Sequence, residues 1–371
     1  MNKYIKNKIT FVILGSVGTL GHISLASDIA RIARYCEMDI SVSLIIEECT
    51  IPPAFGQYFD EVTLIRPRLQ RCSRGGRLNE PYLGHEIDQA IRHYKDSVFL
   101  FSTFFDTNII KLIRQLGAFC GLITYPFRTS KFQLFLYEGF DRLFDDIVIL
   151  DDIISPIESS ELANIRTNVF LLPPSIYGYN DYSISKQRGA SNLPLTVLTG
   201  CGGGLINGSD VIFRQMLEAI ASFDSRDIRL AIMPGLNNKQ DCLKETFSKT
   251  VFREFDELSI DGGIDLFIGQ SGYHTIHKLL FYSIPSIIVP APRLIDDQEL
   301  RAIMLAQLTD CKVLLPSEMD RIKDVISHCI YAYSQWHHNV RHRVTRLVQQ
   351  KKWASNGLEK WKGYLQRLST Q

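Results

Sequence analysis

The chain has 371 residues, 45% of them apolar, and this length and composition can support two hydrophobic cores. Lys and Arg number 41 against 40 for Asp and Glu, so no overall positive field indicates nucleic acid as the partner. The eight cysteines lack metal-ligand spacing, and no stretch approaches the roughly 20 apolar residues of a membrane span. We therefore expect a two-domain cytoplasmic protein with reduced thiols and no metal site.

The first part of the chain, residues 1–175, alternates apolar runs with segments of helical periodicity. Helices are expected at residues 23–35, 85–95 and 106–115, the last behind Asp106, whose carboxylate can cap its first turn. Short buried strands are expected at residues 9–14, 40–46, 62–65, 97–101, 119–124 and 147–150. Because strands that alternate with helices pair in parallel, we expect an α/β domain with a sheet of about six strands.

Two features of this first domain have more than one interpretation. Gly15, Gly18 and Gly21 superficially resemble the GxGxxG turn of dinucleotide-binding proteins, but their spacing differs, which disfavours that function. The basic stretch 66–77 carries five arginines and no acid. It is either a solvated loop or a site for an anionic acceptor or a membrane surface.

A turn-rich stretch then divides the chain. Residues 176–193 lose periodicity and collect turn formers, which predicts an interdomain linker before a second domain at 194–335. The first strand of that domain breaks into TGCGGG, a glycine loop whose amides can approach a diphosphate, although a plain tight turn is the alternative. Residues 336–371 predict one or two basic amphipathic helices, for packing or for membrane attachment.

The most informative stretch is residues 261–306, where two buried strands each end in a loop. One strand enters the turn 270–272 before a helix, and the next leads to residues 296–298 at the start of another helix. In an open parallel sheet, ligands bind beyond the carboxyl ends of the strands, where glycine and a helix N-terminus suit an anion. The stretch therefore predicts a phosphorylated ligand, and the Gln298 amide suits the hydroxyls of a sugar.

These motifs resemble the donor-binding pattern of GT-B glycosyltransferases, in particular the family 28-like group of the lipid-linked N-acetylglucosaminyltransferase of peptidoglycan synthesis. The matching positions are Asp265, Gln270, Ser271, Gly272, Thr275, Pro285, Pro290, Asp297, Gln298 and Ala302. Two positions depart from the pattern: Lys278 stands where a ribose-binding glutamate is expected, and Arg301 where an asparagine is expected. Because an ammonium group only donates hydrogen bonds, the ribose contact of the family is not carried over.

The resemblance implies a GT-B fold, with two Rossmann-like domains facing across a cleft and a C-terminal helix that crosses back to the first domain. It implies inverting, metal-independent transfer from a nucleotide-diphosphate sugar, with a UDP-sugar as co-substrate and no separate cofactor. His22, in the loop GTLGH, is the candidate base or acceptor aligner, and Gly21, Asp106 and Arg128 accompany it on the acceptor side. The expected donor-binding residues are Gly200, Gly202, Gly203, Gly204, Gln270, Ser271, Gly272, Thr275, Lys278, Asp297 and Gln298.

Other functions remain compatible with the same motifs. A GT-B chain can also be a nucleotide-sugar epimerase or hydrolase, because fold alone does not fix function. A non-catalytic subunit is the third alternative, for which Lys278 and Arg301 are the sequence evidence. The acceptor is left open, with an anionic molecule and peripheral membrane contact as the alternatives.

Overall fold

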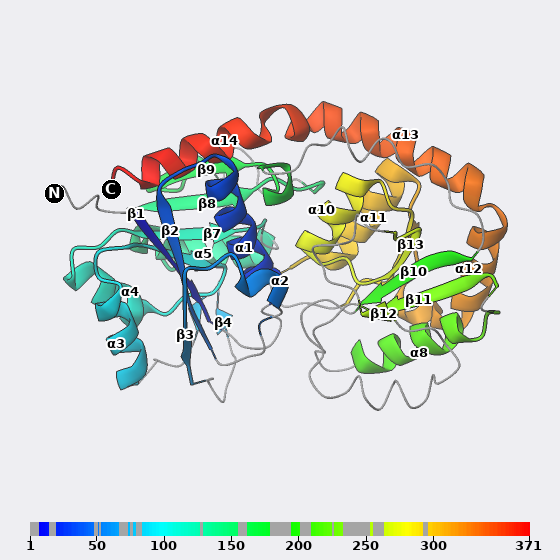
Figure 1. Cartoon of the computed structure of the whole chain (residues 1–371), viewed down its shortest axis with the longest axis horizontal. Helices are drawn as coiled ribbons and strands as arrows, with labels where there is room; N and C mark the ends of the chain where they lie inside the picture. Colours follow the sequence, from blue (N-terminus) through cyan, green and yellow to red (C-terminus); the bar gives the residue numbers. More distant parts are fainter. Residues whose placement is uncertain are drawn as a thin grey trace. The chain divides into compact units, whose positions relative to one another are not determined.

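The computed structural model describes residues 7–14, 20–47, 51, 53–66, 73–74, 77–78, 84–126, 129–154, 162–178, 194–200, 209–224, 226–232, 253–254, 263–291 and 296–371. The chain divides into two compact units. The first comprises Met1–Tyr179 together with Asn356–Gln371, and the second comprises Asn180–Ser355. Each unit contains one parallel β-sheet with associated helices (Figure 1).

The first unit is built on a seven-stranded parallel sheet of order β3-β2-β1-β6-β7-β8-β9. Its strands are β1 (Asn7–Ile13), β2 (Ile40–Glu47), β3 (Glu61–Ile65), β6 (Val98–Ser102), β7 (Cys120–Thr124), β8 (Asp146–Leu150) and β9 (Asn168–Leu172). The central strands β6 and β7 are buried along their whole length, which explains their uninterrupted apolar sequences. The sequence predicts about six strands, and the sheet has seven. The prediction omits the edge strand β9, of which only the last residue is buried and which leads directly into two prolines.

Helices and 3₁₀ turns connect the strands of this unit. They are α1 (Leu20–Tyr35), α2 (Pro53–Gly56), α3 (His85–His93), α4 (Thr107–Gln115), α5 (Thr129–Tyr137), η1 (Phe140–Leu143) and η2 (Ser175–Gly178). The sequence does not predict α5, which has no acidic residue in its first turn. At the end of the basic stretch 66–77, β4 (Ser73–Arg74) pairs antiparallel with β5 (Arg77–Leu78). The turn η2 lies where the linker is expected to begin, and its side chains are buried in the first unit.

The last helix, α14 (Trp353–Leu368), has most of its length in the first unit, which includes the chain from Asn356 onward. Figure 1 shows it beside β8 and β9. Its Trp361 indole donates to the carbonyl oxygen of Pro173 at 3.0 Å, and Arg367 donates two hydrogen bonds to the carboxylate of Asp146, at 3.0 and 3.1 Å. The expected return of the C-terminal helix to the first domain is confirmed.

The second unit has a six-stranded parallel sheet of order β12-β11-β10-β13-β14-β15. Its strands are β10 (Leu195–Gly200), β11 (Ile228–Ile232), β12 (Arg253–Glu254), β13 (Leu266–Gly269), β14 (Ser286–Ile288) and β15 (Lys312–Val313). Its helices are α8 (Ser209–Ala221), α10 (Tyr273–Tyr282), α11 (Gln298–Thr309), η4 (Pro316–Arg321), α12 (Ile322–Tyr331) and α13 (Tyr333–Lys351). Within the described residues, no helix combines the length and the apolar composition needed to cross a bilayer.

Candidate functional site

The acceptor-side candidate His22 lies in the first turn of α1, beyond the carboxyl end of β1, and is 6% exposed. Its Nδ1 atom lies 2.8 Å from the hydroxyl of Ser102, the last residue of β6. Because β1 and β6 are paired neighbours, the sheet brings together two side chains that are 80 positions apart in the chain. Sequence reasoning selected His22 and missed Ser102, although a polar residue directly after a buried strand was a signal.

The backbone turns sharply immediately after Ser102. Thr103 has a φ of 63°, in the left-handed region that a β-branched residue rarely adopts. The Phe104 amide donates to the Ser102 carbonyl at 2.7 Å, and the Thr103 amide donates to the Ile123 carbonyl in β7 at 2.9 Å. The Phe104 ring then lies edge-on to His22, with ring centroids 5.6 Å apart. Such strained residues cluster at functional sites, where the surrounding structure holds them in place.

Burial determines the protonation of His22. It lowers the pKa of the imidazole from 6.5 to about 4, because the charged ring would lose its hydration. The ring is therefore neutral at pH 7, with one nitrogen donating and the other accepting. In the tautomer whose Nδ1–H donates to Ser102, Nε2 is an acceptor for a ligand hydroxyl. Tyr125 stacks near the same ring, with a centroid distance of 6.4 Å.

The other expected acceptor-side residues differ in what the structure describes. Gly21 precedes His22 in the first turn of α1. Asp106 is the N-cap of α4, as predicted, and its carboxylate accepts from the amides of Asn108 and Ile109 at 2.7 and 3.2 Å. Arg128 lies outside the described residues. An acceptor contact of any of these three stays a prediction.

The donor-side candidate centres on the carboxyl ends of β10 and β13 in the second unit. Gly200 and Gly269 are register partners, and the amide of Gln270 donates to the Gly200 carbonyl at 3.2 Å. A Cβ at Gly269 would lie 2.3 Å from that carbonyl oxygen, so only glycine permits this approach. The expected phosphate-contact glycines at 202–204 lie outside the described residues.

Arg301, the departure from the family pattern in α11, is fully buried and connects two loops. Its Nη1 atom lies 2.7 Å from Oδ1 of Asp296, an ion pair, and donates to the carbonyl oxygen of Ser271 at 3.1 Å. Its guanidinium also lies over the Tyr273 ring, 5.7 Å from the centroid. The arginine therefore braces the turn before α10 against the loop before α11.

A second set of hydrogen bonds ties the same two loops together. The Ser271 hydroxyl donates to the carbonyl oxygen of Gln298 at 2.8 Å, and the side-chain oxygen of Gln298 accepts from the amide of Ala291 at 3.2 Å. Asp297 is the N-cap of α11 and accepts from the Leu300 amide at 3.3 Å. Gln298 thus uses its side-chain oxygen within the protein, and its Nε2 amide is the group it would offer a sugar.

The N-terminus of α10 has the geometry of an anion-binding site. Its N-cap is Gly272, in an extended conformation, which has no side chain to cap the first-turn amides. A Cβ built at Gly272 would have only the Thr275 hydroxyl within 4 Å, at 3.9 Å. Backbone amides and the helix dipole both favour a negative group at such a position.

Lys278 lies on α10 one and a half turns after the N-cap and is only 4% exposed. A solvated surface lysine, the alternative to a donor contact at this position, is therefore excluded, and the donor contact stays a prediction. Helical periodicity and charge suggest exposure, but the sequence does not show that α10 is buried along most of its length.

Among the described residues there is no group of three His, Cys, Asp or Glu that could hold a metal ion.

Neither a protein-family model nor a curated protein sequence matches the chain. Among solved structures it is similar to TcCGT1 in complex with UDP, with a TM-score of 0.61 and 11% identity over 98% of this chain and 99% of that one. It is similar to the spinosyn forosaminyltransferase SpnP, with a TM-score of 0.59 and 11% identity over 98% and 100% of the two chains. MurG of Acinetobacter baumannii aligns with a TM-score of 0.50 and 12% identity over 92% and 98%.

These similarities extend over nearly the whole length of each chain, while the identities are low. They establish the fold, which is the GT-B fold with two Rossmann-like domains, and confirm that expectation.

Proposed function

We propose that this protein is a glycosyltransferase that moves a sugar from a nucleotide-diphosphate sugar, with a UDP-sugar as donor, to an acceptor hydroxyl. The observation that supports this best is the braced turn 270–272 leading into the uncapped start of α10, at the carboxyl end of β13. Its amides suit an anion, and solved structures with the same fold include proteins in complex with UDP.

In this proposal the second unit binds the donor. The amides of Ser271 and Gly272, in the turn before α10, would hold the diphosphate together with the glycine loop, and Gln298 and Asp297 would hold the sugar. The full proposed donor set is Gly200, Gly202, Gly203, Gly204, Gln270, Ser271, Gly272, Thr275, Lys278, Asp297 and Gln298. Arg301, which pairs with Asp296 and donates to the Ser271 carbonyl oxygen, would hold the turn in place.

The first unit would bind the acceptor, with its hydroxyl donating to Nε2 of His22 while Nδ1–H donates to Ser102. The acceptor oxygen attacks the anomeric carbon, the bond from that carbon to the diphosphate oxygen breaks, and the configuration inverts. Because a group with a pKa of about 4 is a weak base, His22 would orient the hydroxyl and take its proton only as the new bond forms. The amides would stabilise the leaving diphosphate without a metal ion.

The first experiment is a thermal unfolding screen of the full chain with UDP, GDP, dTDP and their nucleosides. A nucleotide at ~100 times its Kd stabilises the folded protein by about 2.7 kcal/mol, which moves the midpoint measurably. We expect UDP to stabilise the protein more than uridine does. Failure of every nucleoside diphosphate to shift the midpoint would contradict the proposal.

A second experiment separates transfer from other reactions on this fold. Incubation of the protein with UDP-sugars without an acceptor measures spontaneous turnover: rapid hydrolysis or epimerisation would favour those activities over transfer. Lys278 and Arg301 were the sequence evidence for a non-catalytic subunit. Arg301 no longer supports that alternative, because its contacts with Ser271 and Asp296 give it a structural role that is independent of catalysis.

A further inference from the structure

A polar hollow of about 410 Å³ lies in the first unit, formed by the second half of α5, by η1 and by the turn before β9. η1 leads into the amino end of β8, and the turn leads into the amino end of β9. His22 and Ser102 lie at the carboxyl ends of the strands, which is the opposite edge of a parallel sheet. The hollow is therefore separate from the proposed acceptor residues.

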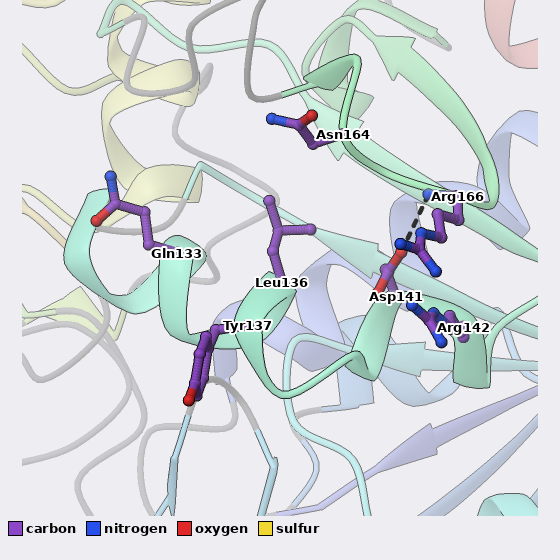
Figure 2. A pocket seen from close by; sticks show the side chains of 7 residues that line it. All are labelled: Gln133, Leu136, Tyr137, Asp141, Arg142, Asn164 and Arg166. Carbon is purple, nitrogen blue, oxygen red and sulfur yellow. Dashed lines mark hydrogen bonds between the residues drawn. The ribbon is translucent and has the colours of Figure 1, made fainter.

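Two arginines give the hollow its charge. Figure 2 shows Arg142 and Arg166 on one side, beside Asp141, with Gln133 and Tyr137 of α5 on the other. Within the described part of the chain, neither of the two guanidinium groups has a carboxylate partner. Other arginines of this unit have carboxylate partners: Arg114 pairs with Asp145 at 2.7 Å, and Arg367 pairs with Asp146 at 3.0 Å. The hollow thus presents a local excess of positive charge.

The backbone that carries these arginines is firmly held. The buried carboxylate of Asp141 accepts from the amide of Arg166 at 3.0 Å, which fixes the turn to η1. Two residues further on, Asn168 donates to the carboxylate of Asp146 at 3.1 Å, and Thr167 donates to the carbonyl oxygen of Phe144 at 2.7 Å. These contacts fix the backbone on which both arginines are carried, while the two side chains themselves are exposed and accessible to a ligand.

We propose that this hollow binds an anionic saccharide, a sugar that carries a carboxylate or a phosphate group. A guanidinium fork matches the geometry of either oxyanion and donates two hydrogen bonds at once. The amides of Gln133 and Asn164 suit sugar hydroxyls, and the ring of Tyr137, which is 86% exposed, offers an apolar face with a polar tip. The volume falls within the range of about 300–1,000 Å³ that small-molecule sites occupy.

The test is calorimetric titration of the full chain with glucuronate, glucose 6-phosphate, glucose and inorganic phosphate. Glucuronate and glucose 6-phosphate distinguish the two oxyanions. We expect at least one of them to bind more tightly than both glucose and phosphate. The double variant Arg142→Gln/Arg166→Gln should weaken that binding at least about tenfold, since a hydrogen bond to a charged group contributes about 1.5–3 kcal/mol.

Arg92→Gln is the matched control, because Arg92 is an exposed arginine of the same unit on α3, away from the hollow. It should bind the probe as the wild type does, and circular dichroism checks that both variants are folded. Three results would overturn the proposal: no binding of either anionic sugar, equal binding of glucose or of phosphate alone, or unchanged binding in the double variant. The wild-type comparison alone overturns the proposal when neither anionic sugar is preferred, and the double variant assigns a preference to the hollow.

Discussion

Arg301 donates from Nη1 to the carbonyl oxygen of Ser271 across 3.1 Å, and this contact joins α11 to the turn before α10. The same nitrogen lies 2.7 Å from the carboxylate of Asp296, and both side chains are buried. One guanidinium therefore connects the two loops that the sequence marks as ligand-binding. The arginine that replaces the expected asparagine thus stabilises the turn. Its presence is not evidence that the site has been lost.

Replacing Arg301 with Met should destabilise the second unit by about 3–5 kcal/mol, because it breaks a buried ion pair with Asp296 and removes the hydrogen bond to Ser271. Urea unfolding of the two proteins measures this loss. The double variant Arg301→Met/Asp296→Leu should recover part of it, since it removes both charges together. A loss of less than about 1 kcal/mol in the single variant would show that the pair is no more important than a surface ion pair.

Two glycines of α14 provide a comparison within one helix. A Cβ at Gly357 would lie 2.3 Å from the carbonyl oxygen of Tyr177, whereas a Cβ at Gly363 would meet nothing within 4 Å. Gly357→Ala should therefore destabilise the first unit by about 1–3 kcal/mol through overpacking. Gly363→Ala should stabilise it by about 0.5–1 kcal/mol, because alanine is the better helix former.

Thermal unfolding of the two alanine variants, compared with wild type, checks the opposite signs. The same direction of change in both variants would contradict the close packing of α14 on η2. Because both glycines lie in one helix, differences in intrinsic helix propensity cancel in the comparison.

The elements of this fold could be predicted from local patterns far better than its contacts. Apolar runs that end in glycine predicted β10 and β13, and Asp297 was placed correctly ahead of a helix. The contact between His22 and Ser102 depends on strand order, which the sequence does not state. Arginine is rarely buried, so the complete burial of Arg301 could not be expected from its residue type.

The low pKa of His22 predicts a specific dependence of stability on pH. The folded pKa is about 4 and the unfolded value is 6.5, so the unfolded chain binds more protons between these values. The free energy of unfolding therefore keeps its full value above pH 6.5. It falls by up to roughly 3 kcal/mol as the pH decreases to about 4. Urea unfolding at several pH values between 4 and 7 measures this effect. The free energy of unfolding of His22→Gln should rise less steeply with pH than that of wild type. Equal slopes would mean that the imidazole is not buried as described.

His22→Gln should also reduce transfer, by ~100- to 10,000-fold, while leaving the Kd for UDP unchanged. Ser102→Ala should cause a smaller loss, because it removes the group that orients the ring and keeps the accepting nitrogen. Steady-state rates together with UDP titrations separate these effects. Near-wild-type turnover in His22→Gln would reduce His22 to a structural residue.

The most direct test of the donor site uses Gly272, the N-cap of α10. An aspartate there would accept from the first-turn amides and place a negative charge where the diphosphate is proposed to bind, while supporting the helix as a cap. Gly272→Asn is the uncharged control of the same shape. Calorimetric titration with UDP and uridine should show that Gly272→Asp weakens UDP binding at least about tenfold and more than Gly272→Asn does, with uridine affinity unchanged. Equal UDP affinities for wild type and Gly272→Asp would contradict the placement of the diphosphate at this helix.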